Sequence, residues 1–266
     1  MNTTVPRALT IAGSDSGGGA GIQADLKTFT VFEVFGMSAI TSVTAQNTKA
    51  VLGISNLSAD FVGLQIDAVV KDIGVDAVKI GMLSNRDIVQ VVARKISEHG
   101  LQNVVLDPVM VSSNGDPLLE SDAVELLITK LFPLSKVVTP NIPEAEVITG
   151  STISSVHEMK IVAEKIKFLG PENVLLKGGH FQNSKEAIDI LYDGENFHEY
   201  VTSRIDTKNT HGTGCTYSAA ICAGLAKGFS IHESVKIAKN YVTLAIQNSF
   251  DLGKGHGPLN HFYKID

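Results

Sequence analysis

The stretch of this sequence best suited to chemistry is Asn-Thr-His-Gly-Thr-Gly-Cys at residues 209–215, which an apolar, alanine-rich helical stretch follows. Glycines at the start of a helix let successive backbone N–H groups point at one spot, and the helix dipole adds positive potential there. Gly212, Thr213 and Gly214 therefore predict an anion hole that suits a phosphoryl group. Cys215 falls in the first helical turn, where we expect a lowered thiol pKa. The alternative is a loop with a buried structural cysteine.

A second glycine-rich stretch, residues 13–21, follows the first predicted strand and begins at Gly13. It is not a P-loop, because no Gly-Lys-Ser/Thr sequence ends it, and Ile22 stands where a dinucleotide-binding motif needs its last glycine. We interpret it as a flexible wall of a substrate pocket. Asp25, further along, is expected to accept a hydrogen bond from a substrate hydroxyl, although acidic residues in a first helical turn are common without any ligand.

Hard oxygen ligands follow two later strands: Asp107 after one, and Asn141 with Glu144 after the next. Mg²⁺ prefers one or two carboxylates together with waters and substrate phosphates, so this set predicts a site for Mg²⁺ and a nucleotide. Lys177, beside two glycines, is expected to reach a nucleotide phosphate. The structural alternatives are a helix N-terminal acid for Glu144 and an exposed turn lysine for Lys177.

The remaining cysteine and the histidines give little sign of further chemistry. Cys215 and Cys222 lie in one predicted helix, which puts their Cα atoms roughly 10 Å apart. A disulfide needs about 7 Å or less, so we expect them to be unpaired. The histidines at positions 180, 211, 256 and 261 are not spaced as a metal cluster, and we predict none of them as a zinc ligand.

The elements that position these residues are short β-branched runs alternating with amphipathic helical stretches. The strands are almost continuously apolar, which is typical of a sheet covered on both faces, and the alternation predicts an α/β fold with a mostly parallel, doubly wound sheet. Ligands of such sheets collect at the carboxyl ends of the strands, where the clusters above fall. Residues 188–192 and 197–201 instead predict an antiparallel hairpin near the sheet edge. The other predicted strands are 8–12, 39–44, 77–80, 104–107, 137–139 and 174–176.

Helix starts also have readable signals. Ser84 precedes Asp87, and Ser155 and Ser230 are each followed three residues later by a glutamate. These spacings predict capped helix N-termini at the three serines.

Composition limits the function classes. The 266 residues, 44% of them hydrophobic, can form a sizeable core, and we expect residues 1–266 to be one domain. A formal net charge of −6 without a basic stripe argues against a nucleic-acid partner. No run of about 18 apolar residues predicts a membrane span. Residues 1–7 lack the apolar stretch of a secretory signal, so we expect a cytoplasmic protein.

Six motifs occur in a fixed order along the chain. They are Gly-Ser-Asp-Ser-Gly-Gly-Gly-Ala-Gly-Ile-Gln-Ala-Asp-Leu-Lys-Thr (13–28), Gly-Met-Leu (81–83), Asp-Pro-Val-Met (107–110), Thr-Pro-Asn-Ile-Pro-Glu-Ala (139–145), Lys-Gly-Gly-His (177–180) and the 209–215 sequence. Together they resemble the hydroxymethylpyrimidine/phosphomethylpyrimidine kinases of thiamine biosynthesis, in the ribokinase-like superfamily. The resemblance covers nearly the whole chain, and Gly-Lys-Gly-His-Gly-Pro at 253–258 is similar to the family's tail.

The resemblance implies a three-layer, ribokinase-like α/β fold, with ATP and Mg²⁺ as cofactors and a homodimer as the assembly. It implies that Cys215 occupies the position of the catalytic base, beside Gly212, Thr213 and Gly214. The positions assigned to the pyrimidine pocket are Gly13, Asp25, Gln46 and Met82. Those assigned to the nucleotide are Asn141, Lys177 and Thr210, and those near the metal are Asp107 and Glu144.

We therefore expect two ATP-dependent transfers, first to the hydroxymethylpyrimidine alcohol and then to its monophosphate. Gln46 favours this over pyridoxal or pyridoxine kinase, an alternative that stays open, because an amide can pair an exocyclic amino group and the adjacent ring nitrogen at once. A hydrolase using Cys215 and His211 is less favoured, since a glycine-rich anion hole with separate carboxylates suits phosphates better than acyl groups. A nucleotide-binding regulatory module without catalysis is the third alternative.

Overall fold

The chain folds around a nine-stranded sheet in a computed structural model that describes residues 5–111, 115, 118–179 and 185–263. The strand order is β3-β2-β1-β4-β5-β6-β7-β8-β9. Pairing is parallel from β2 through β7, whereas β3 at one edge and β8 and β9 at the other pair antiparallel. The strands are β1 (Arg7–Asp15), β2 (Phe35–Gln46), β3 (Val51–Asn56), β4 (Ala77–Ile80), β5 (Val104–Leu106), β6 (Val137–Val138), β7 (Val174–Lys177), β8 (Glu186–Tyr192) and β9 (Phe197–Ser203).

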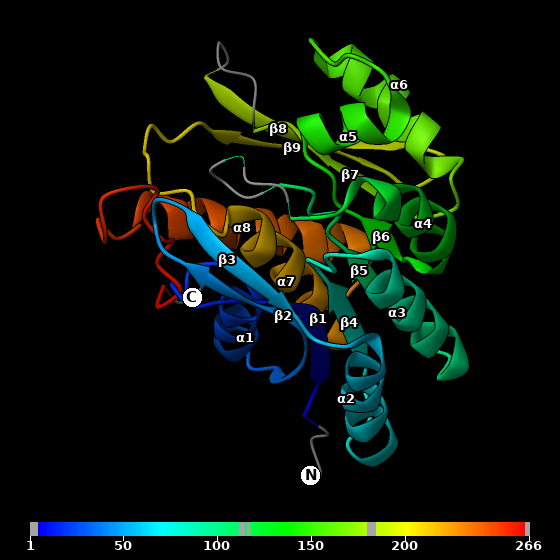
Figure 1. Ribbon diagram of the computed structural model, residues 1–266. Helices are drawn as coiled ribbons and strands as arrows, with labels where there is room; N and C mark the ends of the chain where they lie inside the picture. The colour runs from blue at the N-terminus through cyan, green and yellow to red at the C-terminus, as the bar shows by residue number, and fades with distance from the viewer. Residues whose placement is uncertain (1–4, 112–114, 116–117, 180–184, 264–266) are drawn as a thin grey trace.

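Helices cover both faces of this sheet (Figure 1), which confirms the three-layer arrangement. Side chains alternate between the faces: Leu9 and Ile11 of β1 join the core under α2 to α6, whereas Ala8 joins the core under α1, α7 and α8. No helix in the described part of the chain is long and apolar enough to cross a membrane. The helices are α1 (Gly21–Val31), α2 (Ala59–Asp72), α3 (Arg86–Glu98), α4 (Ser121–Leu131), α5 (Ile142–Thr149), α6 (Val156–Lys167), α7 (Thr213–Ala226) and α8 (Ile231–Gln247), with a short 3₁₀ turn at Phe132–Leu134.

The predicted strands and the edge hairpin are confirmed, although β1 and β2 run further than predicted. The prediction omits β3, because its side chains are almost all exposed and it contains Gly53, so it lacks the pattern of a central strand. Ser155 and Ser230 cap their helices as predicted. The cap of α3 is Asn85 rather than Ser84, because the Asn85 side chain accepts a hydrogen bond from the backbone N–H three residues on.

The parallel strands bring their carboxyl ends to one edge of the sheet, and the N-terminus of α7 lies against them. Asn141 and Lys177, which follow β6 and end β7, form an isolated parallel bridge. Thr139 Oγ1 donates to Asp107 Oδ1 at 3.1 Å, and Ser218 Oγ in α7 lies 3.3 Å from Asp107 Oδ2. Residues far apart in sequence therefore meet at this edge.

Candidate active site

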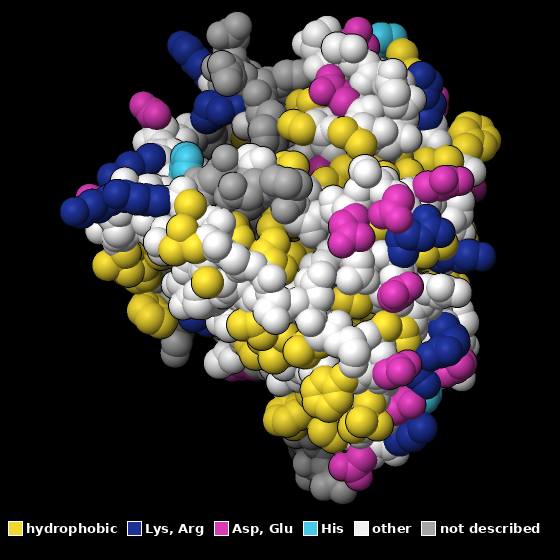
Figure 2. Space-filling view, viewed as in Figure 1, with side chains coloured by type: hydrophobic (Ala, Val, Ile, Leu, Met, Phe, Trp, Pro, Cys, Tyr) yellow, Lys and Arg dark blue, Asp and Glu magenta, His cyan; other side chains and the backbone are white. Residues whose placement is uncertain are grey.

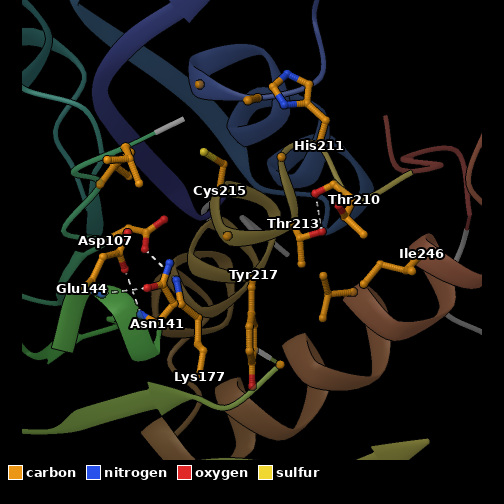
Figure 3. Close-up of a pocket in the computed structure, with 18 of the residues that line it drawn as sticks. Asp107, Asn141, Glu144, Lys177, Thr210, His211, Thr213, Cys215, Tyr217 and Ile246 are labelled. Atoms are coloured by element: carbon orange, nitrogen blue, oxygen red, sulfur yellow. Dashed lines mark hydrogen bonds and ion pairs between the residues drawn. The ribbon is translucent and has the colours of Figure 1, made fainter. Parts of the chain in front are cut away.

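A cavity of about 590 Å³ lies at this edge of the sheet. In Figure 3, Cys215 lies between His211 on one side and the group formed by Asp107, Asn141, Glu144 and Lys177 on the other. The structure brings together all the predicted site residues except Asp25. The predicted residues that line the cavity are Gly13, Gln46, Met82, Asp107, Asn141, Glu144, Lys177, Thr210, Gly212, Thr213, Gly214 and Cys215.

The N-terminus of α7 is built from glycines because other backbone passes very close to it. Gly212 is the N-cap, with a left-handed φ of 82°, and a Cβ on it would lie 1.8 Å from the Gly19 oxygen. A Cβ on Gly214 would lie 3.4 Å from Asp107 Oδ2 and 3.5 Å from Lys177 Nζ. The N–H groups of Gly214 and Cys215 have no acceptor within the helix, since the first turn lacks a preceding one. They are available to an anion in the cavity.

Cys215 faces the cavity and is only half-buried as a residue, while its thiol is surrounded by protein. Burial raises the pKa of this thiol to about 11, and Lys79 and the Gly21 N–H oppose the shift only in part. The predicted lowering of the Cys215 pKa is therefore wrong, because loss of hydration outweighs the helix N-terminus. Cys215 and Cys222 are both free, as predicted.

A buried ion pair joins Lys177 Nζ to Asp107 Oδ1 at 2.9 Å. Burial opposes ionisation of Asp107, but Lys177 and Lys79 hold the pKa of its carboxyl below the ordinary value. Burial raises the pKa of Glu144 to about 7, although the charge of Lys177 opposes the shift. Two carboxylates thus share the charge of Lys177, and a further cation here would stabilise ionised Glu144.

Asn141 and Glu144 are held by the start of α5. The Asn141 side chain accepts from the Glu144 N–H at 2.9 Å, and Glu144 Oε2 accepts from the Asn141 N–H at 2.8 Å. This reciprocal capping box accounts for the two residue types. The helix-start interpretation of Glu144 is therefore correct, and the same hydrogen bonds fix Glu144 in the cavity wall.

The structure corrects the role expected for Asp25. Its side chain is fully buried, accepts a hydrogen bond from Thr10 Oγ1 at 2.6 Å, and pairs with Lys79 Nζ at 2.9 Å. Lys79 lines the cavity, whereas Asp25 is not among the lining residues. Burial would lower the pKa of Lys79, but the carboxylates of Asp25 and Asp107 raise it. In this structure Asp25 therefore balances the positive charge of Lys79, which lines the cavity.

Asp15 and His211 form a part of the site that the sequence did not reveal as a unit. The Asp15 carboxylate accepts from the backbone N–H groups of Gly17, Gly19 and Ala20 at 2.7–3.0 Å, and His211 Nε2 lies 2.9 Å from its Oδ2. The glycine-rich loop is thus ordered around one carboxylate, in contrast to the flexible wall we predicted. An aspartate followed by small residues is typical of turns closed by the side chain, which was the available signal.

Part of the cavity wall comes from α8 and β8, in residues that sequence reasoning missed. Lys239 of α8 is only 8% exposed, and its Nζ lies 2.7 Å from Asp189 Oδ2. The other oxygen of Asp189 accepts from the Gly178 N–H at 3.0 Å. The only sequence signal for this part of the cavity was a lysine among the apolar residues of α8. The other residues of α8 that line the cavity, Val242, Thr243 and Ile246, look like ordinary core residues. His180 of the Lys-Gly-Gly-His motif lies outside the described residues.

Known proteins match this chain over most of its length. The family described as phosphomethylpyrimidine kinase matches residues 15–260. A hydroxymethylpyrimidine/phosphomethylpyrimidine kinase of Bacillus subtilis strain 168 is 51% identical over 259 residues, covering 97% of this chain and 96% of that protein. The solved structure of a phosphomethylpyrimidine kinase from Clostridium difficile 630 has a TM-score of 0.81 and 46% identity, covering 91% of this chain and 100% of that chain. An ADP complex of Bacillus subtilis pyridoxal kinase has a TM-score of 0.90 and 41% identity, covering 97% of this chain and 98% of that chain.

Proposed function

Because the chain belongs to the phosphomethylpyrimidine kinase family, we propose that its cavity transfers a phosphoryl group from ATP first to hydroxymethylpyrimidine and then to the monophosphate. The protein is a phosphotransferase of thiamine biosynthesis with a ribokinase-like fold. The observation that carries the two-step proposal is the position of the α7 N-terminus. Gly212, Thr213, Gly214 and Cys215 line the same cavity as Gln46, Met82 and Gly13 and as Lys239.

Gln46, Met82 and Gly13 form the acceptor end of the cavity. The Gln46 Nε2 lies 3.5 Å from His211 Nε2, and its Oε1 lies 3.2 Å from Thr44 Oγ1, so neighbours orient the amide. An amide held in this way can donate to a ring nitrogen and accept from an exocyclic amino group. Met82 Sδ is 3.1 Å from where a Cβ on Gly13 would lie, so a side chain at position 13 would crowd Met82.

The transfer itself rests on electrostatic positioning. In this proposal the N–H groups of Gly214 and Cys215 stabilise the charge that develops on the phosphoryl oxygens, and Lys177, which lies beside Gly214, adds a positive charge. Cys215 is a neutral thiol near pH 7, so its sulfur accepts a hydrogen bond from the attacking alcohol and holds it in line. As the new O–P bond forms and the bond to the ADP oxygen breaks, the alcohol proton passes to an oxygen of the transferred phosphoryl group. This role needs no preformed thiolate.

Asp107 and Glu144 fit Mg²⁺ by their chemistry. They are two hard carboxylates in one cavity wall, and the raised pKa of Glu144 marks a place where added positive charge is favourable. When bound there, Mg²⁺ neutralises charge on the nucleotide phosphates. Asn141, Lys177 and Thr210 are proposed to contact the nucleotide.

We also propose a cytoplasmic homodimer of single-domain chains, without a nucleic-acid or membrane partner. Large hydrophobic side chains gather over β3 and α2 on the face that Figure 2 shows. Leu52 and Leu64 are 74% and 60% exposed, and Ile54 and Phe61 are exposed beside them in the same two elements. Contiguous exposed apolar surface of this kind is typical of protein–protein contacts, which supports a second copy of the chain as the partner.

A coupled ATP-consumption assay with three acceptors tests the proposed function. We expect higher kcat/KM for hydroxymethylpyrimidine than for pyridoxal, and turnover of the hydroxymethylpyrimidine monophosphate by the same enzyme. The TM-score of 0.90 with a pyridoxal kinase makes pyridoxal the necessary competitor. Equal or faster turnover of pyridoxal would replace the proposal with a vitamin B6 kinase. ATP binding without transfer to any acceptor would favour a regulatory module.

A further inference from the structure

Three side chains far from the motifs above converge at the closed end of the β8–β9 hairpin. Asp193 directly follows β8, His198 lies in β9, and His232 lies in the first turn of α8. One nitrogen from each histidine and one carboxylate oxygen all lie within 4.8 Å of one another. The side chains of Asp193, His198 and His232 are 21%, 38% and 41% exposed, so solvent ions can reach them.

The separations of the ligand atoms match those of a small tetrahedral metal centre. The Nε2 atoms of His198 and His232 lie 2.9 Å and 3.7 Å from Asp193 Oδ2. Metal–ligand bonds of about 2.1 Å at tetrahedral angles put ligand atoms roughly 3.4 Å apart, a value between the two measured distances.

The surrounding structure aims these ligand atoms at one point. Asp193 Oδ1 accepts from the backbone N–H groups of Glu195 and Asn196 at 2.9 Å and 2.7 Å, which turns Oδ2 toward the histidines. Tyr200, two residues after His198 on β9, donates its hydroxyl to the His232 carbonyl at 3.3 Å and so fastens the start of α8 to the strand. Hydrogen bonds that orient ligands from behind are a regular feature of metal sites.

We propose that Asp193, His198 and His232 form a binding site for a Zn²⁺-type divalent cation, distinct from the phosphotransfer site. Imidazole suits Zn²⁺, Ni²⁺ and Cu²⁺, whereas Mg²⁺ prefers oxygen ligands throughout. Each histidine binds through the lone pair of Nε2, so the Nε2 proton that His198 donates to Asp193 is displaced and Nδ1 carries the ring proton. A water completes the fourth position.

A cation at this site would link the β8–β9 hairpin to α8. The hairpin and α8 also carry Asp189 and Lys239, whose ion pair lines the cavity. The proposed metal ligands lie at the other end of the hairpin, near its turn. Asp193, His198 and His232 do not line the cavity. A bound cation would therefore stabilise the packing of the β8–β9 hairpin on α8 without entering the cavity.

Zinc titration of the full chain tests this proposal, after treatment with EDTA and removal of the chelator, without nucleotide or magnesium. A competing chromophoric chelator reports the affinity, and thermal unfolding reports the coupling to stability. We expect one saturable Zn²⁺ site per chain and a Tm that rises with zinc, because a ligand that binds only the folded state stabilises it. His198→Gln and His232→Gln should each weaken binding at least roughly 10- to 100-fold, the range that even outer hydrogen-bond partners carry.

His157→Gln is the matched control, because His157 is an exposed histidine outside the cluster. It should bind zinc as the parent chain does. Asp193→Asn removes the ligand charge but keeps an oxygen for the backbone N–H groups, so its Tm without zinc checks that the hairpin is intact. Unchanged zinc affinity in the His198→Gln/His232→Gln double variant would overturn the proposal and assign the zinc to another site. Absence of saturable binding up to millimolar zinc would overturn it as well.

Discussion

The Cys215 thiol lies beside the Gly21 N–H and Lys79, which favour a thiolate, and among protein atoms that disfavour it. Burial dominates and sets the pKa at about 11, so only about one thiol in 3,000 is ionised at pH 7.5. Cys215 is therefore a neutral thiol near neutral pH, which fits the proposed role of orienting the acceptor alcohol. This differs from cysteine nucleophiles, whose reactivity depends on a lowered pKa.

Alkylation of Cys215 by iodoacetamide follows from this protonation state. We expect a slow reaction at pH 7.5 whose rate rises about tenfold per pH unit to beyond pH 9, since the rate follows the thiolate fraction. Peptide mass spectrometry measures it. Cys222→Ala should leave the rate unchanged, because Cys222 is fully buried and its thiol pKa is raised further. A rate that levels off near pH 7 would contradict the raised pKa.

Gln46 should decide the choice of acceptor. Removing one partner of a buried hydrogen-bonding group costs about 1–3 kcal/mol, so Gln46→Ala should lower kcat/KM for hydroxymethylpyrimidine by roughly 5- to 150-fold. Turnover of pyridoxal, which lacks the amino group, should change far less. Steady-state kinetics with both acceptors provide the measurement, and Gln102→Ala, at an exposed glutamine elsewhere, is the control. An equal loss for both acceptors would place Gln46 outside the acceptor contacts.

The ionisation of Glu144 should make stability fall with rising pH. Burial raises its pKa from the ordinary 4.5 to about 7 in the folded chain, so the folded state binds more protons than the unfolded state between these values. The contribution to stability is complete below pH 4.5 and is lost as pH rises through about 7, which amounts to about 2 kcal/mol between pH 5.5 and 8.

Urea denaturation of the nucleotide-free chain at the two pH values measures this contribution. Glu144→Gln should flatten the loss, because a glutamine keeps the capping oxygen without the charge. Glu146→Gln, at a half-buried position on the same helix, should keep the parent slope. Parallel pH profiles for Glu144→Gln and the parent chain would show that Glu144 does not titrate in this range.

At the scale of elements, the site depends on two loops meeting at the start of α7. The glycine-rich loop that follows Asp15 contributes the Gly19 carbonyl. The loop before α7 contributes Gly212, whose backbone lies against this carbonyl. His211, one residue earlier, reaches back to the Asp15 carboxylate. The direction of the α7 N–H groups is therefore set jointly by segments that lie almost 200 positions apart, with His211 and Asp15 separated by 196.

Gly212→Ala should disrupt the contact between the two loops. Its Cβ would lie 1.8 Å from the Gly19 oxygen, so overpacking of about 1–3 kcal/mol adds to the left-handed strain of about 1–2 kcal/mol. Gly228→Ala is the matched control, because Gly228 has the same φ of 82° with nothing within 4 Å of an added Cβ. We expect Gly228→Ala to lose some stability but keep kinase activity, and Gly212→Ala to lose both. Similar activity in the two variants would mean that the contact does not position the site.

At the scale of the whole molecule, the two edges of the sheet differ. One edge carries the β8–β9 hairpin, which α8 and α6 adjoin, and the other carries β3 with its exposed apolar side chains. Edge strands offer unpaired backbone groups to other chains, so natural proteins cover or charge them. Among the described residues, the β3 edge with the exposed Leu52 and Ile54 carries no charged side chain of its own and is not covered by another element.

A homodimer that buries this surface should be lost on charging it. Size-exclusion chromatography with light scattering should give twice the chain mass of 28.3 kDa for the parent chain and the single mass for Leu52→Asp/Leu64→Asp. Phe168→Asp is the control, since Phe168 is 89% exposed but lies at the end of α6. Dimers that persist in the double variant would locate the interface elsewhere.

The central strands, the edge hairpin and the cavity-lining motifs could be predicted because local signals carry them. Buried strands such as 104–106 and 174–176 are apolar throughout, and turn residues follow them at the edge where ligands bind. Two glycines next to Cys215 at a predicted helix start are a local signal of an anion hole, so this part of the site could be predicted from the sequence. The exposed β3 gave no such pattern, which is why it was missed.

The state of each charged group was decided only by the tertiary structure, because it depends on burial and on partners from distant segments. The pKa of Cys215 rises because strands and loops enclose it, against the local effect of its helix. Asp25 is fully buried and pairs with Lys79, 54 residues further along the chain, and it is not among the cavity-lining residues. Asp193, His198 and His232 have no metal-site spacing in sequence, and only the packing of a hairpin on a helix brings their ligand atoms within 4.8 Å.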